Sequence, residues 1–337
     1  MRLSELPRVL LGTLPTPLDE APRLSQALGG LRVLLKRDDL TGFALGGNKV
    51  RKLEYLLAKA LDQNADVVVT GAGLQSNHLR TTAAGARKLG LDAVLVMHGD
   101  PPAEVQGNYL LDRLAGAEII FTGDDDRSSV DRALEEVADD LRRRGRRPYV
   151  IPRGGASPLG SVGYVACALE MEMQLVAQGE RADHLVCATG ACGTQAGLWL
   201  GATWLQAPYR IWGISVSRPR EECLARVRSL ATATAELLEL APPPPSAAPT
   251  VLEDYLGPGY GIVTPEAVEA IRLLARTEGV FLDPVYTGKA VAGLVDLVRQ
   301  GEISRDETVV FLHTGGAPGL FAHARELRGR HTPRRSY

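Results

Sequence analysis

The sequence of 337 residues has few aromatic residues and almost no net charge. Phenylalanine, tryptophan and tyrosine make up 5% of the chain, and its formal net charge at pH 7 is −2. A chain so close to neutral gives no electrostatic reason to expect nucleic acid or an anionic membrane as a partner. The basic segment 328–337 is expected to be a solvated tail rather than a binding arm.

Cysteines and long apolar runs are also scarce. The four cysteines, Cys167, Cys187, Cys192 and Cys223, form no CxxC pair and have no cluster of histidines beside them. We therefore expect reduced thiols and no metal site. No apolar run is long enough to span a bilayer, and the N-terminus lacks the pattern of a signal peptide. A cytoplasmic location is the expectation that follows.

The chain instead has the composition and rhythm of an α/β protein. Hydrophobic residues make up 45% of it and glycine occurs 36 times, which suits tightly packed layers. Strands are expected at 31–35, 66–70, 93–97, 118–121, 148–151, 184–188, 210–216 and 308–312. Helices are expected at 54–61, 79–89, 105–114, 129–146, 162–178, 195–205, 265–277 and 288–300. The alternation predicts parallel strands joined by crossover helices.

A glycine-rich stretch at 154–160 interrupts this rhythm and is expected to form a hinge or turn. We predict two α/β domains, a smaller one at 48–162 and a larger one made of 1–47 and 163–337. The first segment is assigned to the larger domain because connections between packed elements are short.

Lys49 is the most informative residue, since it follows Gly46, Gly47 and Asn48 at the expected start of an amphipathic helix. Two glycines allow a tight backbone approach. A lysine at such a junction can be desolvated and bonded to a carbonyl as a Schiff base. Taken alone, it is one of 38 lysines and arginines, most of which are solvated surface charges.

A second motif, 189–194, lies between the strand 184–188 and a helix. It contains Thr189, Gly190, Gly193 and Thr194. A small-residue turn at a helix N-terminus offers free N–H groups and the positive end of the helix dipole, and two threonine hydroxyls can complete a phosphate cradle. The motif matches neither the P-loop nor the dinucleotide fingerprint, and glycine turns of this kind are common without a ligand.

Three further polar clusters lie at 75–78, 282–289 and 313–317, the last at the end of a buried strand. The carboxyl ends of parallel strands are where open α/β sheets bind ligands. Tyr286 and Thr314 can act there, although each can also serve only local packing. A Schiff-base lysine, a phosphate cradle and strand-end polar groups are together what pyridoxal phosphate requires.

These motifs carry a resemblance to a known family. The segments 47–54, 75–78, 282–289 and 313–318 resemble the family of D-cysteine desulfhydrase and 1-aminocyclopropane-1-carboxylate deaminase, and the resemblance covers nearly the whole chain. It implies a pyridoxal-phosphate enzyme of fold type II, with a tryptophan-synthase β-like, two-domain fold of parallel-rich, open twisted sheets flanked by helices. It also implies a homodimer.

The resemblance assigns roles to particular residues. Lys49 would form the Schiff base and move the α-proton, with Lys52 beside the phosphate. The cofactor-binding residues implied are Lys49, Lys52, Asn77, Thr189, Gly190, Ala191, Cys192, Gly193, Thr194 and Thr314. The catalytic residues implied are Lys49, Ser76, Tyr260 and Tyr286, and the substrate-binding residues are Ser76, Asn77, His78, Arg153, Tyr260, Tyr286 and Thr287.

Two positions favour the desulfhydrase branch. The deaminase branch has glutamate and leucine where this chain has Thr287 and Thr314. A carboxylate at the pyridine nitrogen makes the ring a strong electron sink that helps to open a cyclopropane. Hydroxyl groups suffice when a good β-leaving group departs. The resemblance thus favours elimination on D-cysteine, giving pyruvate, ammonia and sulfide.

Arg153 and Ala156 depart from the desulfhydrase pattern, and a guanidinium at 153 can pair with a sulfonate or second carboxylate of a substrate. It can equally be a surface charge at a hinge. The L-cysteate sulfo-lyases share the pattern at 188–197 and are an open alternative. A non-catalytic binding protein of the same fold and a nicotinamide-dependent oxidoreductase are alternatives of other classes, and the missing dinucleotide fingerprint disfavours the latter.

Overall fold

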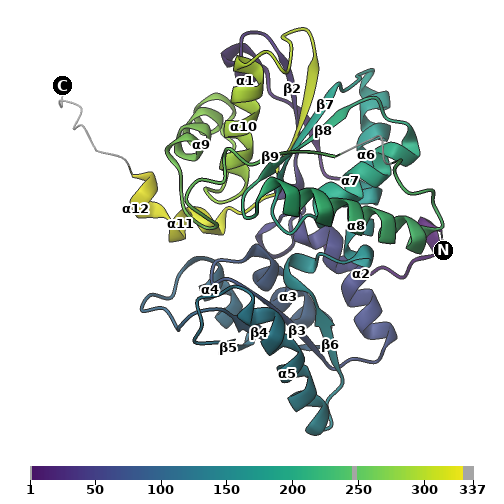
Figure 1. The fold of residues 1–337 in the computed structure, drawn as a ribbon, viewed down its shortest axis with the longest axis vertical. Helices are drawn as coiled ribbons and strands as arrows, with labels where there is room; N and C mark the ends of the chain where they lie inside the picture. Colours follow the sequence, from purple (N-terminus) through teal and green to yellow (C-terminus); the bar gives the residue numbers. More distant parts are fainter. Residues whose placement is uncertain (1, 245–248, 329–337) are drawn as a thin grey trace.

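The computed structural model describes residues 2–244 and 249–328, which form two parallel-rich sheets flanked by helices (Figure 1). The segment 329–337, most of the expected solvated tail, lies outside the described residues. The fold confirms the expected α/β class. Within the described part, no helix is both long enough and apolar enough to cross a membrane.

The larger sheet has, within the described residues, six strands in the order β1-β2-β10-β7-β8-β9. These strands are β1 (Leu18–Glu20), β2 (Arg32–Lys36), β7 (His184–Thr189), β8 (Arg210–Ser215), β9 (Thr250–Leu252) and β10 (Thr308–Leu312). Only β1 pairs antiparallel, with β2, and the other pairs are parallel. The N-terminal segment therefore contributes two strands, β1 and β2, to this sheet.

The smaller sheet is wholly parallel over the described chain, in the order β5-β4-β3-β6. Its strands are β3 (Val67–Ala72), β4 (Asp92–Met97), β5 (Glu118–Phe121) and β6 (Pro148–Ile151). The domain boundaries expected at 47/48 and 162/163 enclose this sheet and stay a prediction.

The helices that cover the two sheets differ greatly in length. They are α1 (Pro22–Ala27), α2 (Lys49–Asp62), α3 (Asn77–Lys88), α4 (Gly107–Leu114), α5 (Ser129–Arg143), α6 (Pro158–Gln178), α7 (Gly193–Leu205), α8 (Arg220–Leu238), α9 (Pro265–Glu278), α10 (Thr287–Arg299), α11 (Pro318–Ala322) and α12 (Ala324–Leu327). Short 3₁₀ turns lie at Leu3–Glu5, Asp38–Leu40, Phe43–Leu45 and Arg153–Gly155.

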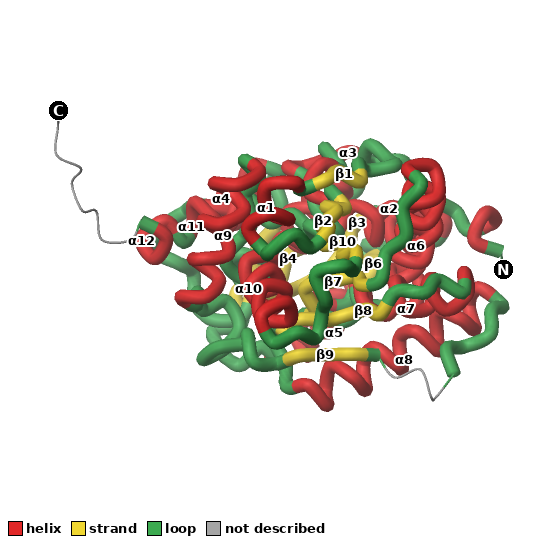
Figure 2. Tube along the Cα trace, turned by 90° about the horizontal axis from the view of Figure 1, so that it is seen from above, coloured by secondary structure: helices red, strands yellow, loops and turns green. Residues whose placement is uncertain are grey.

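Alternate residues of the larger sheet pack on opposite faces, because successive side chains of a strand point to opposite sides. On β2, Val33 and Leu35 join a buried cluster with α1, α9 and α10, whereas Leu34 joins one with α6 and α7. Figure 2 shows the strands between these two helical layers. In the smaller sheet, α2, α3 and α4 pack on one face and α5 on the other.

Two helices begin earlier in the chain than the ranges predicted for them. The helix expected at 54–61 is longer and begins at Lys49, which agrees with the prediction that this lysine lies at a helix start. The helix expected from 162 begins at Pro158, where the Ser157 hydroxyl accepts a hydrogen bond from the Gly160 N–H at 3.1 Å. The predicted hinge is thus a 3₁₀ turn followed by a capped helix start.

Helix α8 was not predicted, although its sequence signal is present. Pro219 precedes it, Glu221 and Glu222 occupy its first turn, and Val227, Ala231 and Leu238 lie at helical spacing on its buried side. Short elements such as β1, β9 and α1 were also missed, since a few residues give no periodicity to detect.

Candidate active site

Two adjoining cavities lie between the carboxyl ends of the strands of both sheets. The first cavity is lined by Asn48, Lys49, Lys52, Asn77, Ala188, Thr189, Gly190, Ala191, Cys192, Thr194, Gln195, Tyr286 and Thr314. The second cavity is lined by Lys49, Ala72, Gly73, Ser76, His78, His98, Arg127, Arg153, Gly154, Gly190, Ala191, Ser217, Arg218, Tyr260 and Tyr286. Lys49 and Tyr286 belong to both, so a molecule bound in one can reach into the other.

Two glycines bring the lysine to this place. Gly46 and Gly47 have φ of +71° and +115°, a region that residues with a side chain rarely adopt. A Cβ on Gly46 would lie 1.9 Å from the Asp39 carbonyl oxygen, and one on Gly47 would lie 3.0 Å from the Thr314 carbonyl oxygen. The glycines therefore let the start of α2 approach the end of β10.

Lys49 is half-buried and forms no ion pair with an acidic residue of the described structure. Its Nζ donates to the Gly154 carbonyl oxygen at 3.1 Å, and burial lowers its pKa to about 8. Lys52 lies one helical turn further on the same side of α2, and burial, followed by the charge of Lys49, lowers its pKa well below the usual value. Lys49 can therefore be a neutral nucleophile near physiological pH.

The N-terminus of α7 borders the first cavity, at the turn where the sequence predicts a phosphate cradle. The first N–H groups of a helix have no partner within the helix and attract anions. A Cβ on Gly193 would lie 3.0 Å from Lys52 Nζ, so the lysine packs directly against this turn. The Asn48 amide donates to the Thr194 hydroxyl at 3.2 Å, which ties the start of α2 to the start of α7.

One part of the expected cradle needs correction. Thr189 is fully buried, and its hydroxyl donates to the Gln195 side-chain oxygen at 2.8 Å. Its proton is thus already used within the protein, because a hydroxyl has a single hydrogen to donate. Thr194 and the helix N–H groups are the remaining donors of the motif. Gln195, which lines the first cavity, was not predicted.

Ser76, Asn77 and His78 lie at the start of α3 beside the cavities. The Ser76 hydroxyl caps the helix by accepting from the His78 and Leu79 N–H groups at 3.2 and 3.4 Å. Asn77 Oδ1 accepts from the Asn108 amide at 3.0 Å, which leaves the Asn77 amide protons available to a ligand. Burial, followed by Lys49 and Lys52, lowers the pKa of His78, so it is neutral near pH 7.

Tyr286 is positioned by Asp283. The Asp283 carboxylate accepts from the N–H groups of Val285, Tyr286 and Thr287, each at 2.8–2.9 Å. The Tyr260 and Tyr286 hydroxyls lie 2.5 Å apart, and burial, then Tyr260, raises the pKa of Tyr286 well above its ordinary value. A hydrogen-bonded pair of phenols is thus present beside the two cavities.

Thr287 does not lie where the resemblance implies. Its hydroxyl donates to Asp283 Oδ1 at 2.7 Å and accepts from the Asp283 N–H at 2.7 Å, and it is absent from the lining of both cavities. This placement does not support direct contact between Thr287 and a substrate, because the Thr287 hydroxyl is hydrogen-bonded within the turn that holds Tyr286. Thr314, by contrast, lines the first cavity.

Arg153 lines the second cavity, but its guanidinium is partly engaged. It donates to the Arg127 carbonyl oxygen at 2.9 Å and pairs with Asp131 at 2.5 Å. His98, Arg127 and Arg218 were not predicted. The available signal is their position: each follows a predicted strand within a few residues, where parallel sheets place their ligand-binding side chains.

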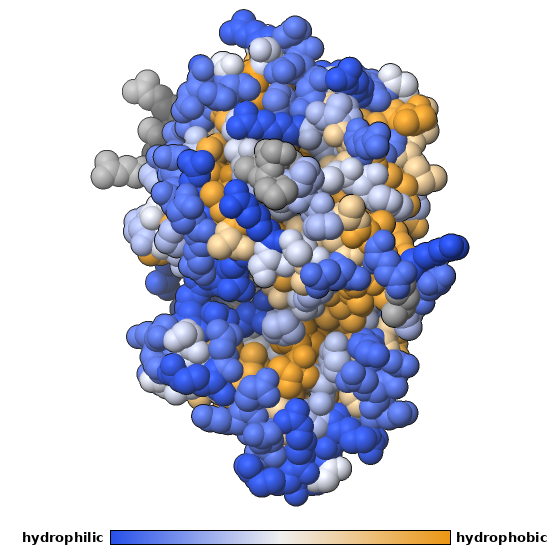
Figure 3. Space-filling view, turned by 45° about the vertical axis from the view of Figure 1, so that its right-hand side comes forward, coloured by the Kyte–Doolittle hydropathy of each residue, from blue (hydrophilic) through white to orange (hydrophobic). Residues whose placement is uncertain are grey.

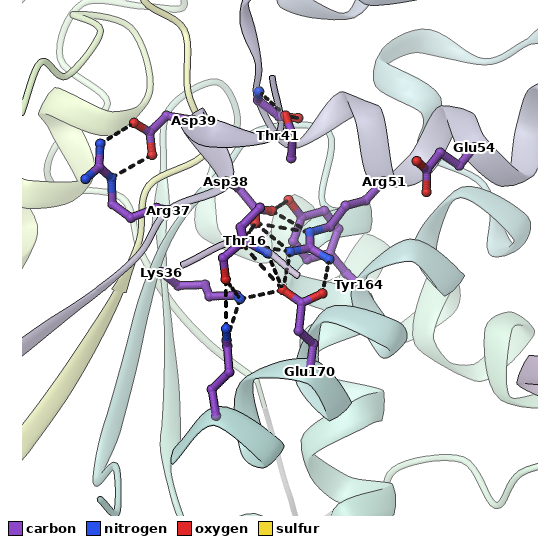
Figure 4. A network of polar contacts seen from close by, with 12 residues as sticks. Thr16, Lys36, Arg37, Asp38, Asp39, Thr41, Arg51, Glu54, Tyr164 and Glu170 are labelled. Atoms are coloured by element: carbon purple, nitrogen blue, oxygen red, sulfur yellow. Dashed lines mark hydrogen bonds and ion pairs between the residues drawn. The ribbon is translucent and has the colours of Figure 1, made fainter. Parts of the chain in front are cut away.

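A network of buried ion pairs holds the first turns of helix α2 in place (Figure 4). Arg51 donates to Asp38 at 2.8 and 2.9 Å and to Glu170 at 2.8 and 2.9 Å. The Tyr164 hydroxyl donates to Asp38 at 2.5 Å, and Lys36 Nζ lies 2.5 Å from Glu170. Arg51 lies between Lys49 and Lys52 in the sequence, so the network sets the orientation of both lysines.

The first cavity fits a ligand with a phosphate and an aldehyde. Two desolvated lysines and a helix N-terminus supply positive potential, and no aspartate or glutamate lines it within the described structure. An amine with a pKa of about 8 suits attack on a carbonyl. Over the described residues, no group of three or more His, Cys, Asp or Glu is arranged to hold a metal.

Comparison with known proteins shows the family of this chain. Residues 9–315 match the family model described as "Pyridoxal-phosphate dependent enzyme". A protein of Pyrococcus horikoshii, provisionally named 1-aminocyclopropane-1-carboxylate deaminase, is 44% identical over 329 residues, which cover 96% of each chain.

Solved structures show the same family and the same fold. A structure described as a homologue of 1-aminocyclopropane-1-carboxylate (ACC) deaminase is 44% identical and covers 97% of both chains, with a TM-score of 0.90. A solved threonine deaminase is 22% identical, covers 89% of this chain and 92% of its own, and has a TM-score of 0.64, which shows a shared fold.

Proposed function

The chain belongs to the family of pyridoxal-phosphate-dependent enzymes, and on that premise we propose that it catalyses α,β-elimination on D-cysteine or a similar β-substituted amino acid. The products would be pyruvate, ammonia and sulfide. The protein is an enzyme whose cofactor is pyridoxal 5′-phosphate, and its fold is type II. The choice of reaction within the family is the proposed step.

The residues of the site supply what this elimination needs. Pyridoxal phosphate, when bound, supplies an electron sink for the charge left on the substrate α-carbon. Lys52, Thr194 and the N-terminus of α7 would hold its phosphate, and the Asn77 amide would donate to its ring hydroxyl. Lys49 Nζ would take the α-proton, while the Ser76 hydroxyl would donate to the substrate carboxylate. The Cβ–S bond would break, its electron pair leaving with sulfur.

The observation that carries the choice of elimination is the absence of a carboxylate around the cofactor cavity. In the described part of the chain no aspartate or glutamate lines either cavity, and the hydroxyl residue Thr314 lines the first. A hydroxyl leaves the pyridine nitrogen neutral, which makes a weaker electron sink than a protonated ring. A weaker sink suffices for a good β-leaving group but disfavours opening a cyclopropane.

ACC deamination is the second candidate, favoured by the names of the relatives. L-cysteate sulfo-lyase activity is a third, favoured by the arginines of the second cavity. A non-catalytic binding protein is disfavoured, because the family consists of enzymes.

A substrate panel tests the proposal. Purified holoenzyme is incubated with D-cysteine, L-cysteine, L-cysteate, ACC and 2,3-diaminopropionate, and keto acids are identified by mass. We expect pyruvate and sulfide from D-cysteine. A four-carbon keto acid from ACC, without pyruvate from any cysteine, would instead establish the deaminase, since ACC has four carbons.

The lowered pKa of Lys49 predicts how the apoenzyme captures its cofactor. Only the neutral amine attacks the aldehyde, and with a pKa of about 8 its neutral fraction rises with pH up to that value and then levels off. We expect the rate of capture to rise about tenfold between roughly pH 6 and pH 7 and to flatten above roughly pH 9. Stopped-flow absorbance after mixing with pyridoxal phosphate measures it.

An ordinary lysine would behave differently, since its neutral fraction keeps rising toward its pKa of about 10.4. A capture rate that still climbs tenfold per pH unit above roughly pH 9 would contradict a lowered pKa. Lys49→Ala serves as the control for changes in free pyridoxal phosphate with pH.

We also propose that the enzyme is a homodimer joined through the face of α6, α7 and α8. Met173 is 65% exposed and Val176 77%, and the nearby groove is lined by Met173, Trp204, Leu240 and other apolar residues. Figure 3, which brings this side forward, shows hydrophobic residues gathered across it. Exposed apolar residues gathered on one face of a protein usually mark a contact with another protein. A cytoplasmic location stays an expectation.

A charge introduced on this face should therefore break the dimer. Met173→Asp would place a carboxylate in the contact, and we expect at least about a tenfold rise in the dimer dissociation constant. Light scattering after gel filtration measures the mass. Leu114→Asp, at a residue 73% exposed on α4, is the matched control. A wild-type protein that is monomeric at micromolar concentration would refute the proposal.

A further inference from the structure

We propose that the second cavity binds an anionic substituent on the substrate β-carbon, and that Arg127 is the residue that selects for its negative charge. This inference rests on the proposed function, because it assumes an amino-acid substrate bound at Lys49. The substituent class is one with anionic oxygens, such as a sulfonate, a sulfate ester or a carboxylate.

The cavity collects positive charge from three separate loops. Arg127 follows β5, Arg153 follows β6 and Arg218 follows β8, and all three side chains line the space that Lys49 also borders. No aspartate or glutamate lines this space in the described structure. The cavity measures about 60 Å³, which admits a compact group of few atoms.

The three arginines differ in how far their charge is already balanced. Arg153 pairs with Asp131 at 2.5 Å, and Arg218 pairs with Glu222 at 3.1 Å. Arg127 forms no ion pair with any described residue. Its guanidinium donates to the Ser217 carbonyl oxygen at 3.5 Å. Arg127 therefore supplies the uncompensated charge, which an anion within the cavity would balance.

Buried polar atoms beside the cavity point to the same kind of ligand. Arg218 Nε and His98 Nε2 are buried without a hydrogen-bond partner in the described structure. Burial, followed by the charge of Arg127, lowers the pKa of His98, while the charge of Asp125 opposes this shift. Buried donors normally have partners, and an oxygen-rich ligand would provide them.

The position of Arg127 relative to the reacting groups fits the β-substituent rather than the α-carboxylate. Its guanidinium lies over the Tyr260 ring, 4.2 Å from the centroid, and the Tyr260 hydroxyl meets that of Tyr286. The stacking holds the guanidinium in place. In the proposed function the α-carboxylate would bind at Ser76, at the N-terminus of α3, so Arg127 and its neighbours remain for the substituent.

The test compares two isosteric ligands that have no leaving group. Aspartate carries a β-carboxylate, whereas asparagine has a neutral amide of the same shape. Calorimetric titration of the holoenzyme with both enantiomers of each measures binding without turnover. We expect aspartate to bind more tightly, and Arg127→Met to weaken aspartate binding about 30-fold more than asparagine binding.

Two variants separate charge from packing. Arg127→Lys keeps the charge and should retain part of the preference for aspartate. Arg132→Gln removes a positive charge from the neighbouring helix α5, where Arg132 pairs with Asp124 at 3.6 Å outside the cavity, and should leave the preference unchanged. Thermal unfolding and cofactor absorbance confirm that each variant is folded and loaded.

The outcomes distinguish this inference from the proposed function. Equal weakening of aspartate and asparagine in Arg127→Met, or no preference in the wild type, would overturn the anion site even if 3-chloroalanine yields pyruvate. Absence of pyruvate from 3-chloroalanine and from both cysteines would overturn the elimination reaction and the inference with it.

Discussion

Replacing Lys49 by alanine is expected to lower the rate of pyruvate formation about a thousandfold or more, since this one side chain is proposed both to bond the cofactor and to move the α-proton. Lys49 is the amine shared by both cavities, and a pKa of about 8 suits a nucleophile. The variant should also lack the visible absorbance of a lysine-bound cofactor that borohydride removes. Steady-state kinetics and absorbance spectra measure the two effects.

Two further variants show whether the loss belongs to the amine itself. Lys49→Arg keeps a positive charge but has no amine to bond the aldehyde, so its spectrum should resemble that of Lys49→Ala. Lys59→Ala, on the same helix and paired with exposed Asp62, should leave activity intact. Activity above one-tenth of wild type in Lys49→Ala would exclude this residue as the catalytic lysine.

The second large effect is expected on stability, from Arg51→Met. Arg51 is 2% exposed and donates to the buried carboxylates of Asp38 and Glu170 (Figure 4). Removing it would leave those carboxylates without their main cation in a region of low polarity. We expect the free energy of unfolding to fall by about 3–5 kcal/mol, measured by urea denaturation.

A solvated ion pair on the same helix provides the comparison. Lys59→Met would remove the pair with Asp62, whose side chain is 53% exposed, and should cost about 0–1 kcal/mol. Similar losses for the two variants would show that the buried network contributes little. Arg51→Met should also weaken cofactor binding, because the network orients the first turn of α2.

Much of the fold could be predicted from residue patterns. Buried strands such as 93–97 and 308–312 are continuous apolar runs, and their alternation with helices fixes a parallel arrangement. Helix starts were less predictable. The start at Lys49 has a local signal in its two glycines, but its position in space depends on the approach of Gly47 to Thr314, which no local pattern records.

The residues of the site also differ in how far the sequence alone predicts them. Lys49, Lys52 and the turn at 189–194 have local signals, since a helix start and a glycine turn are written in consecutive residues. Thr189 and Thr287 have the same residue types as cofactor ligands, yet their hydroxyls are bonded to Gln195 and Asp283. Hydrogen-bond partners are set by neighbours in space, so residue type alone overestimated what these two threonines can do.

The sequence by itself determined the α/β class, and it singled out Lys49 and the turn at 189–194 as candidates, because each of these depends on periodicity or on a short run of residues. Only the tertiary structure decided which polar groups face the cavities. Arg127, Arg153 and Arg218 are far apart in the chain and meet because both sheets bring the carboxyl ends of their strands to one place. Their combined positive charge at the cavity therefore exists only in the folded protein.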